Sequence, residues 1–290
     1  MDMDIDIDIQ AGDIDIRPGQ DIDSPPFQGG RGVRPLSGKV PWPPKFDPTL
    51  DPDSFNPETL RVPLKKFPRH YWDPWRYAFA TIEEFTRTDW KTKITVERPT
   101  PKEIDDAIKR LVAMADTRAA VVPLMMPEIL AQAGDASRYW QAMLMFNARS
   151  HPWTFQAMQM AFHVGRFLAM YYKVQFNMPR PSQLSPAILP WVDVPPHASF
   201  PSGHALEGML MSLVLAELVP EARKPLLELA VRVGRNREIA GLHYFTDTNA
   251  GFRIAQAAFP LLMSCASCQE AVREAKKEWD ALKKERDALK

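Results

Sequence analysis

The sequence of 290 residues predicts an all-α protein, a helical bundle preceded by an extended arm at the amino terminus. Two observations support this prediction. Past residue 67 helical segments predominate, and strand signals are sparse, with Lys93 to Val96 as the best candidate. The length, the hydrophobic content of 45% and the balanced charge suit one sizeable domain with tails.

Residues 1–67 are dominated by Asp, Pro and Gly. Such a stretch buries too little apolar surface to offset its chain entropy, so we expect a largely disordered or extended arm. The Asp-Ile alternation has a period of two and also permits an edge strand that pairs with a second copy, although a solvated acidic tail is the favoured interpretation. Met1 to Asp23 lacks the basic start and the apolar core of an export signal, which predicts a cytoplasmic protein.

A helical domain is predicted over residues 68–265. Thr100 and Glu103 form a capping-box signature for a helix that runs to about Thr117. Further helices are expected near 74–87, 119–133, 136–148, 152–175, 204–218, 221–240 and 245–264. A membrane-spanning helix needs roughly 20 predominantly apolar residues. The longest uncharged stretches, 150–165 and 254–269, are shorter than this, so no transmembrane span is expected.

Residues 266–290 predict a charged amphipathic helix with a narrow apolar stripe. The stripe is formed by Val272, Ala275, Trp279, Leu282 and Leu289. A stripe of this kind packs on its own domain or pairs with a second copy of the chain. A homodimer through this helix, or through the amino-terminal arm, therefore stays open.

Three short segments combine basic, histidine and hydroxyl side chains. They are Lys173 to Pro181 (K-x6-R-P), Pro201 to His204 (P-S-G-H) and Arg237 to Asp247 (R-x5-H-x3-D). A five-coordinate phosphoryl or vanadyl group carries negative charge on its equatorial oxygens, which fixed cations and N–H donors stabilise. Arg180 and Arg237 offer planar forks that bind two oxygens at once, and Lys173 adds a compact charge.

The second segment adds backbone donors. It precedes an apolar stretch from Ala205 to Leu218, so we expect a loop that enters a helix. Free N–H groups at a helix N-terminus favour an anion. Gly203 lets the backbone approach the ligand closely, and Ser202 can donate its hydroxyl.

The two histidines of these segments are expected to divide a reaction between them. Histidine titrates near neutral pH, so a neutral His243 can attack phosphorus while a protonated His204 donates to the leaving oxygen. Asp247 follows His243 by four residues and could hold one of its ring nitrogens. We therefore predict His243 as the nucleophile and His204 as the general acid.

The three segments together resemble the signatures of the superfamily that joins type 2 phosphatidic acid phosphatases, bacterial class A acid phosphatases and vanadium haloperoxidases. The resemblance covers residues 171–251 and keeps the family's order and internal spacing. Asn236 departs from it, because the family often has Ser before the third-signature arginine. The resemblance implies a helical bundle of the acid phosphatase and haloperoxidase type.

The resemblance implies two chemistries on one site. Phosphatase members form a phosphohistidine on the residue that matches His243 and need no metal or other cofactor. Haloperoxidase members bind vanadate at that histidine and use hydrogen peroxide to oxidise halide. Haloperoxidases of the superfamily tend to be much longer than this chain, which favours a soluble phosphatase that acts on a small phosphomonoester or diphosphate.

Two alternatives stay open. His197 lies five residues before Ser202, where bromide-oxidising members carry a histidine, and it keeps the vanadate-dependent haloperoxidase as an alternative. A loop histidine without catalytic duty is the favoured interpretation of this residue. The second alternative is a non-enzymatic oxyanion-binding or assembly module. Zero net charge gives no reason to expect a nucleic acid partner.

Overall fold

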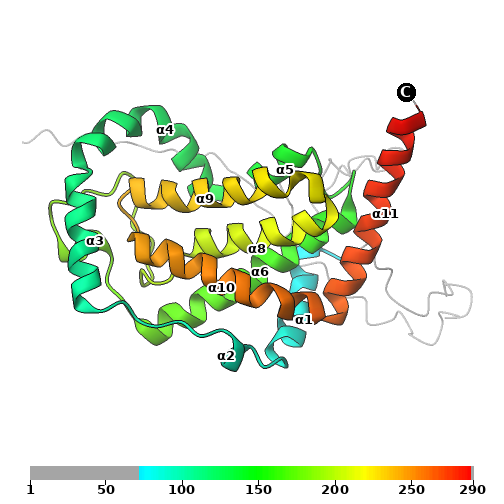
Figure 1. Cartoon of the computed structure of the whole chain (residues 1–290), viewed down its shortest axis with the longest axis horizontal. Helices are drawn as coiled ribbons and strands as arrows, with labels where there is room; N and C mark the ends of the chain where they lie inside the picture. The colour runs from blue at the N-terminus through cyan, green and yellow to red at the C-terminus, as the bar shows by residue number, and fades with distance from the viewer. Residues whose placement is uncertain (1–71, 289–290) are drawn as a thin grey trace, which may run out of the picture. The chain divides into compact units, whose positions relative to one another are not determined.

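A computed structural model of the protein describes residues 72–288, so the predicted arm over residues 1–67 lies outside the described residues. The predicted all-α class is confirmed, because the described residues form helices joined by loops and contain no strand. Figure 1 shows four helices, α6, α8, α9 and α10, running side by side through the bundle. They extend over Pro152–Phe176, Gly203–Leu218, Arg223–Ile239 and Phe245–Ser264, respectively.

Helix α8 is the centre of the core. It packs against α6, α9 and α10, and nearly all its side chains are buried. Because neighbours cover it on every side, its sequence is apolar around the whole helix and shows no amphipathic period. Glu207 is the one charged side chain buried in its interior turns. The packing fixes both ends of α8, and its amino-terminal end carries the P-S-G-H segment.

Further helices surround these four. They are α1 (Pro74–Thr86), α2 (Trp90–Lys93), α3 (Pro101–Ala113), α4 (Ala115–Asp135), α5 (Arg138–Leu144), α7 (Pro181–Leu184), the 3-10 turn η3 (Pro220–Ala222) and α11 (Ala266–Ala288). Helices α3 and α4 lie at one end of the bundle and α11 lies at the other (Figure 1). None of the helices in the described part of the chain combines the length and the apolar character needed to cross a membrane. The cytoplasmic location stays a prediction.

The expected helices are confirmed with small shifts of their ends. The capping box is present, because Thr100 Oγ1 accepts from the Glu103 amide at 3.3 Å and Glu103 Oε2 accepts from the Thr100 amide at 2.8 Å. The helix that it starts ends at Ala113 rather than at Thr117, because Met114 leaves helical geometry with φ −84° and ψ 5°.

The strand expected at Lys93 to Val96 is wrong. Lys93 closes the short helix α2, and the residues after it have no regular structure. A strand needs a neighbour that pairs with its backbone. Here the backbone carbonyl of Ile94 instead accepts from the Tyr172 hydroxyl of α6 at 2.9 Å.

Helix α11 packs on its own domain. Val272 and Ala275 are buried in the main core, and Trp279 packs against it. Glu278 accepts from the backbone amides of Trp153 and Thr154 at 2.8 and 3.0 Å, and thereby caps the start of α6. The described part of the stripe is therefore used within the chain and gives no support to a homodimer.

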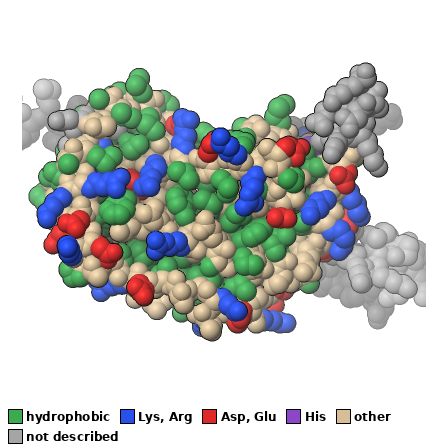
Figure 2. Space-filling model, viewed as in Figure 1, with side chains coloured by type: hydrophobic (Ala, Val, Ile, Leu, Met, Phe, Trp, Pro, Cys, Tyr) green, Lys and Arg blue, Asp and Glu red, His purple; other side chains and the backbone are tan. Residues whose placement is uncertain are grey.

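The side chain of Leu282, and Leu289 altogether, lie outside the described residues. The domain limits 68–265 and 266–290 stay a prediction, although α11 packs within the compact unit that contains α6. Figure 2 shows charged side chains of both signs interspersed over the face of the molecule that it presents.

Candidate active site

The three sequence signatures meet at one end of the bundle, where α6 and α9 end and where α8 and α10 begin. Lys173 lies in the last turn of α6, and Arg237 lies in the last turn of α9. The backbone amide of Ser202 donates to the carbonyl of Asp247 at 3.0 Å, which joins the starts of α8 and α10. Segments up to 74 positions apart in the sequence, from Lys173 to Asp247, thus surround one buried region.

His243 and Asp247 form a buried pair. The Nδ1 atom of His243 lies 2.9 Å from Asp247 Oδ2, and its Nε2 atom lies 3.0 Å from a terminal nitrogen of Arg180. An arginine only donates hydrogen bonds, so Nε2 accepts and the ring proton resides on Nδ1, which donates to Asp247. This tautomer leaves the Nε2 lone pair directed at the cations of the site.

The surroundings keep His243 neutral. Burial, followed by the charges of Arg180 and Lys173, holds its pKa well below the ordinary value. Burial raises the pKa of Asp247 to about 6, while a hydrogen bond from the Ser199 hydroxyl at 2.6 Å acts in the opposite direction. Asp247 also accepts from the Tyr244 amide at 3.3 Å, in the first turn of α10, where a negative charge is favourable.

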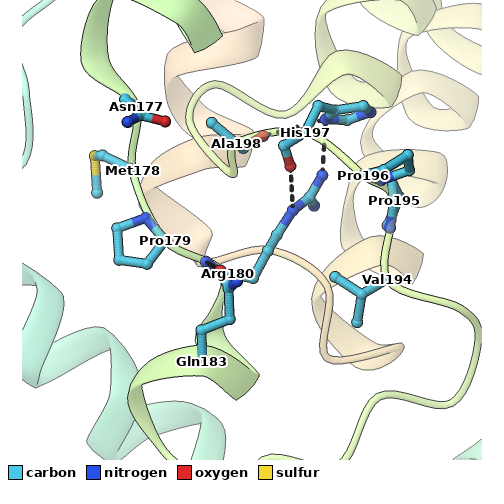
Figure 3. Close-up of a pocket in the computed structure, with 10 residues that line it drawn as sticks. All are labelled: Asn177, Met178, Pro179, Arg180, Gln183, Val194, Pro195, Pro196, His197 and Ala198. Atoms are coloured by element: carbon cyan, nitrogen blue, oxygen red, sulfur yellow. Dashed lines mark hydrogen bonds between the residues drawn. The ribbon is translucent and has the colours of Figure 1, made fainter.

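Arg180 connects His243 to the loop between the first two signatures. It donates through Nε to the carbonyl of His197 at 3.1 Å and through a terminal nitrogen to the Leu242 carbonyl at 2.9 Å. Its other terminal nitrogen lies 3.0 Å from His197 Nδ1. Figure 3 shows Arg180 and His197 side by side in the wall of a cavity of about 370 Å³. Burial lowers the pKa of Arg180 to about 10, which leaves it charged at neutral pH.

Lys173 is the second buried cation. Its ammonium group donates to the carbonyls of Ala198 and Ser199, each at 2.7 Å. Burial, and then the charge of Arg180, lower its pKa to about 7. Lys173 therefore holds the loop before the P-S-G-H segment and loses its charge near neutral pH.

Two buried donors of the predicted anion site have no hydrogen-bond partner among the described residues: Ser202 Oγ and Arg237 Nε. Ser202 is the N-cap of α8, and Gly203 begins this helix, as expected. Arg237 donates through a terminal nitrogen to the Ile129 carbonyl of α4 at 2.8 Å, and burial lowers its pKa to about 10. Buried polar groups are nearly always paired with protein, ligand or water, so these two donors are available to the acceptor oxygens of an anion.

His204 begins the same helix but faces α4. Its Nε2 atom lies 3.0 Å from the Gln132 carbonyl, to which it donates. Burial, and then the charge of Arg237, lower its pKa to about 4. The histidine of the second signature is thus held from a helix that lies outside all three signatures.

Several residues at the site belong to none of the three signatures and were not predicted from the sequence. Ser199, on Asp247, stands in a loop, and Gln132 comes from a helix about 70 positions before the P-S-G-H segment. Glu207 lies one turn after Gly203 on α8. It accepts from Arg166 Nε at 3.1 Å, and burial raises its pKa to about 7. A polar residue inside an otherwise apolar helix was the only signal that could have indicated Glu207.

The comparison with protein families agrees with this arrangement. The family model described as the PAP2 superfamily matches residues 156–269, and all three signatures lie inside the match. The predicted resemblance to this superfamily is thus confirmed over residues 156–269. The matched segment (the PAP2 domain) begins in α6 and includes α8, α9 and α10, the helices that hold the site.

Curated relatives match this chain over 80 to 88 residues. A protein named non-specific acid phosphatase from Providencia stuartii is 35% identical over 88 residues, which is 30% of this chain and 36% of the relative. A protein named acid phosphatase from Zymomonas mobilis subsp. mobilis is 34% identical over 80 residues, which is 28% of this chain and 30% of the relative. The match thus spans about a third of the length of these relatives.

A solved structure matches a larger share of the chain. It is described as the first transmembrane PAP2 type phosphatidylglycerolphosphate phosphatase from Bacillus subtilis. The two are 18% identical with a TM-score of 0.30, over 65% of this chain and 92% of the other. A likeness at this level carries no argument about this chain.

Close packing of the PAP2 domain at the site predicts a large effect of Gly251→Ala. A Cβ atom at Gly251 would lie 2.8 Å from the Ser202 carbonyl oxygen and 3.0 Å from the Leu206 amide. Because these are backbone atoms at the start of α8, we expect a loss of about 1–3 kcal/mol in the free energy of unfolding, measured by urea denaturation. Gly134→Ala is the control, since nothing lies within 4 Å of its added Cβ. Equal stability of both variants would contradict the prediction.

Proposed function

We propose that the protein is a metal-independent phosphatase that hydrolyses a small phosphomonoester or diphosphate. The observation that carries this proposal is the pair of unpartnered buried donors, Ser202 Oγ and Arg237 Nε, beside the neutral nucleophile His243. A phosphoryl group supplies acceptor oxygens for both donors. The names of the acid phosphatase relatives support a phosphoric ester hydrolase.

The proposed reaction has two steps. His243 Nε2 attacks phosphorus, the P–N bond forms and the P–O bond to the leaving group breaks. His204 gives its proton to the departing oxygen. Water then attacks the phosphohistidine, loses a proton to His204, and releases phosphate and His243. Throughout, Asp247 accepts from Nδ1 and stabilises the positive charge that develops on the ring.

The cations of the site are proposed to take the place of a metal. Arg180, Arg237 and Lys173 stabilise the equatorial oxygens, and Ser202 and the first amides of α8 add N–H and O–H donors. Before attack, the phosphoryl group has to replace Arg180 at His243 Nε2, because the two are 3.0 Å apart. The guanidinium then pairs with the phosphoryl oxygens.

A side-by-side assay tests the proposal against the haloperoxidase alternative. Vanadate would meet the same donors and His243 Nε2, and His197, in contact with Arg180, is the observation that favours this alternative. We expect the purified protein to release phosphate from members of a broad phosphoester panel and vanadate to inhibit this release. Halide oxidation with peroxide and vanadate, without phosphate release, would replace the proposal with the haloperoxidase. Binding of phosphate without either reaction would favour a non-enzymatic module.

The pH dependence of kcat/KM follows from His204 and Lys173. The charged form of Lys173 binds phosphate, and its pKa is lowered to about 7, so the clamp loses one positive charge as the pH rises through that value. His204 has to be protonated to act as the general acid, so we expect kcat/KM to decline from about pH 4 upward. The loss of the Lys173 charge adds a second fall above about pH 7, while His243 stays neutral near pH 7 because its pKa is held well below the ordinary value. In Lys173→Arg this second fall should move to higher pH. An unchanged basic limb in that variant would exclude Lys173 as its origin.

A further inference from the structure

We propose that Gln132, in the last turn of α4, is a positioning residue that orients both His204 and Arg237. The inference rests on the proposed function, because it concerns the same reaction. Helix α4 lies outside the segment that matches the PAP2 family model and contains none of the signatures. Its hydrogen bonds with the site come from Glu128, Ile129 and Gln132, in the last two turns of α4.

The backbone of Gln132 orients the general acid. Its carbonyl accepts from His204 Nε2 at 3.0 Å, which places the ring proton of the neutral histidine on Nε2 and leaves Nδ1 for the substrate. The last carbonyls of a helix lack partners within the helix and form the negative end of its dipole, which favours a protonated histidine. The Gln132 carbonyl thus fixes the ring proton of His204, as the Asp247 carboxylate fixes that of His243.

The side chain of Gln132 holds this turn in place and is fully buried. Its Oε1 accepts from Asn236 Nδ2 at 2.9 Å and from Arg237 at 3.4 Å, and its Nε2 donates to Glu128 at 2.8 Å. Arg237 also donates to the carbonyl of Ile129, one turn earlier. These contacts fix one terminal nitrogen of Arg237 against α4 and leave its Nε for a ligand.

Asn236 explains why this chain can use α4 in this way. Its side-chain amide donates to both Gln132 Oε1 and Glu128 Oε1, at 2.9 and 3.0 Å. Glu128 in turn pairs with Arg232 of α9. Apolar packing adds to the attachment, since Ile129 of α4 is fully buried in a cluster with Ala240 and Leu242. The polar network and this packing therefore hold α4 at the site together.

The charged groups around His204 make this contact consequential. The cations that oppose its protonation come from two helices: Arg237 on α9, and Arg166 and Lys173 on α6. Each opposes protonation of His204, whereas the Gln132 carbonyl favours it. Loss of the carbonyl contact should therefore weaken the general acid without removing it.

Leaving-group dependence tests the proposal. Gln132→Met keeps the side-chain size but removes the amide, and we expect kcat for phenyl phosphate, whose leaving group needs a proton, to fall about tenfold or more. For p-nitrophenyl phosphate, whose leaving group departs without much help, the fall should stay under about threefold. Leu130→Ala, exposed on the same helix, is the matched control and should change neither value. Equal falls on both substrates in Gln132→Met would overturn the proposal.

A measurement without substrate separates this inference from the proposed function. In ¹⁵N-labelled protein the His204 ring should titrate at lower pH in Gln132→Met. It should titrate at higher pH in Gln132→Glu, which keeps the acceptor and adds a negative charge. An unchanged His204 titration in both variants would overturn the positioning role. A wild-type protein that hydrolyses neither substrate, yet shows both shifts, would instead contradict the phosphatase assignment.

Discussion

Replacement of His243 by alanine is expected to lower phosphatase activity by at least about a thousandfold and to abolish the covalent phosphoenzyme. The reason is the tautomer in the structure: Nδ1 donates to Asp247 and Nε2 carries the lone pair, and no other described imidazole is held in this way. The measurement is the amount of acid-labile phosphate that stays bound to the denatured protein after a short incubation with ³²P-labelled substrate. Steady-state kcat is measured alongside.

The matched control for this variant is His163→Ala. His163 lies on α6, ten residues before Lys173, and is partly buried. Its ring packs against Trp75 and Phe79 of α1, outside the site. Its replacement should leave both kcat and phosphoenzyme formation close to the wild-type values. If His243→Ala retained a tenth of the wild-type activity, a phosphohistidine at this position would be ruled out.

Replacement of Asp247 by alanine is expected to lower the rate of phosphoenzyme formation by about a hundredfold to a thousandfold. Three donors converge on Asp247 Oδ2: His243 Nδ1 at 2.9 Å, the Ser199 hydroxyl at 2.6 Å and the Tyr244 amide at 3.3 Å. Without the carboxylate, the ring loses its orienting partner and the charge that stabilises it during attack. Single-turnover kinetics on a rapid-quench instrument measure this rate.

Asp247→Asn separates orientation from charge. An amide oxygen at the Oδ2 position still accepts from all three donors, whereas the charge is gone, so its loss should lie between those of the wild type and Asp247→Ala. Urea denaturation of both variants controls for the cap that Asp247 forms at the start of α10. Equal rates for Asp247→Asn and the wild type would show that the charge of Asp247 contributes nothing to the reaction.

Most of the fold could be predicted from local sequence signals. The Thr100 and Glu103 capping box and the apolar stretch after Gly203 each led to a helix close to the one that the structure has. The strand at Lys93 to Val96 was wrong because a strand depends on a partner, and the sequence around it does not say that the Tyr172 hydroxyl binds the Ile94 carbonyl. Local patterns predict helices well because helical hydrogen bonds are themselves local.

The chemical character of the site could be predicted from the order and spacing of its residues. They identified the cations Lys173, Arg180 and Arg237, the donors at the start of α8, and the His243 and Asp247 pair, because these residues are close together in signatures whose spacing can be read directly. Residue types also indicated an anion as the ligand, since their charge and donor groups are intrinsic to them.

How these groups are held depends on the packing of the helices and could not be predicted from local patterns. The contact of Arg180 with His243 places the ring proton on Nδ1, burial brings the pKa of Lys173 to about 7, and Gln132 binds His204 from a helix outside the signatures. Each of these properties arises between segments far apart in the chain, through desolvation and hydrogen bonds that exist only once the helices pack. The sequence therefore specified which groups take part, and the packing of α4, α6, α8 and α10 set their protonation and direction.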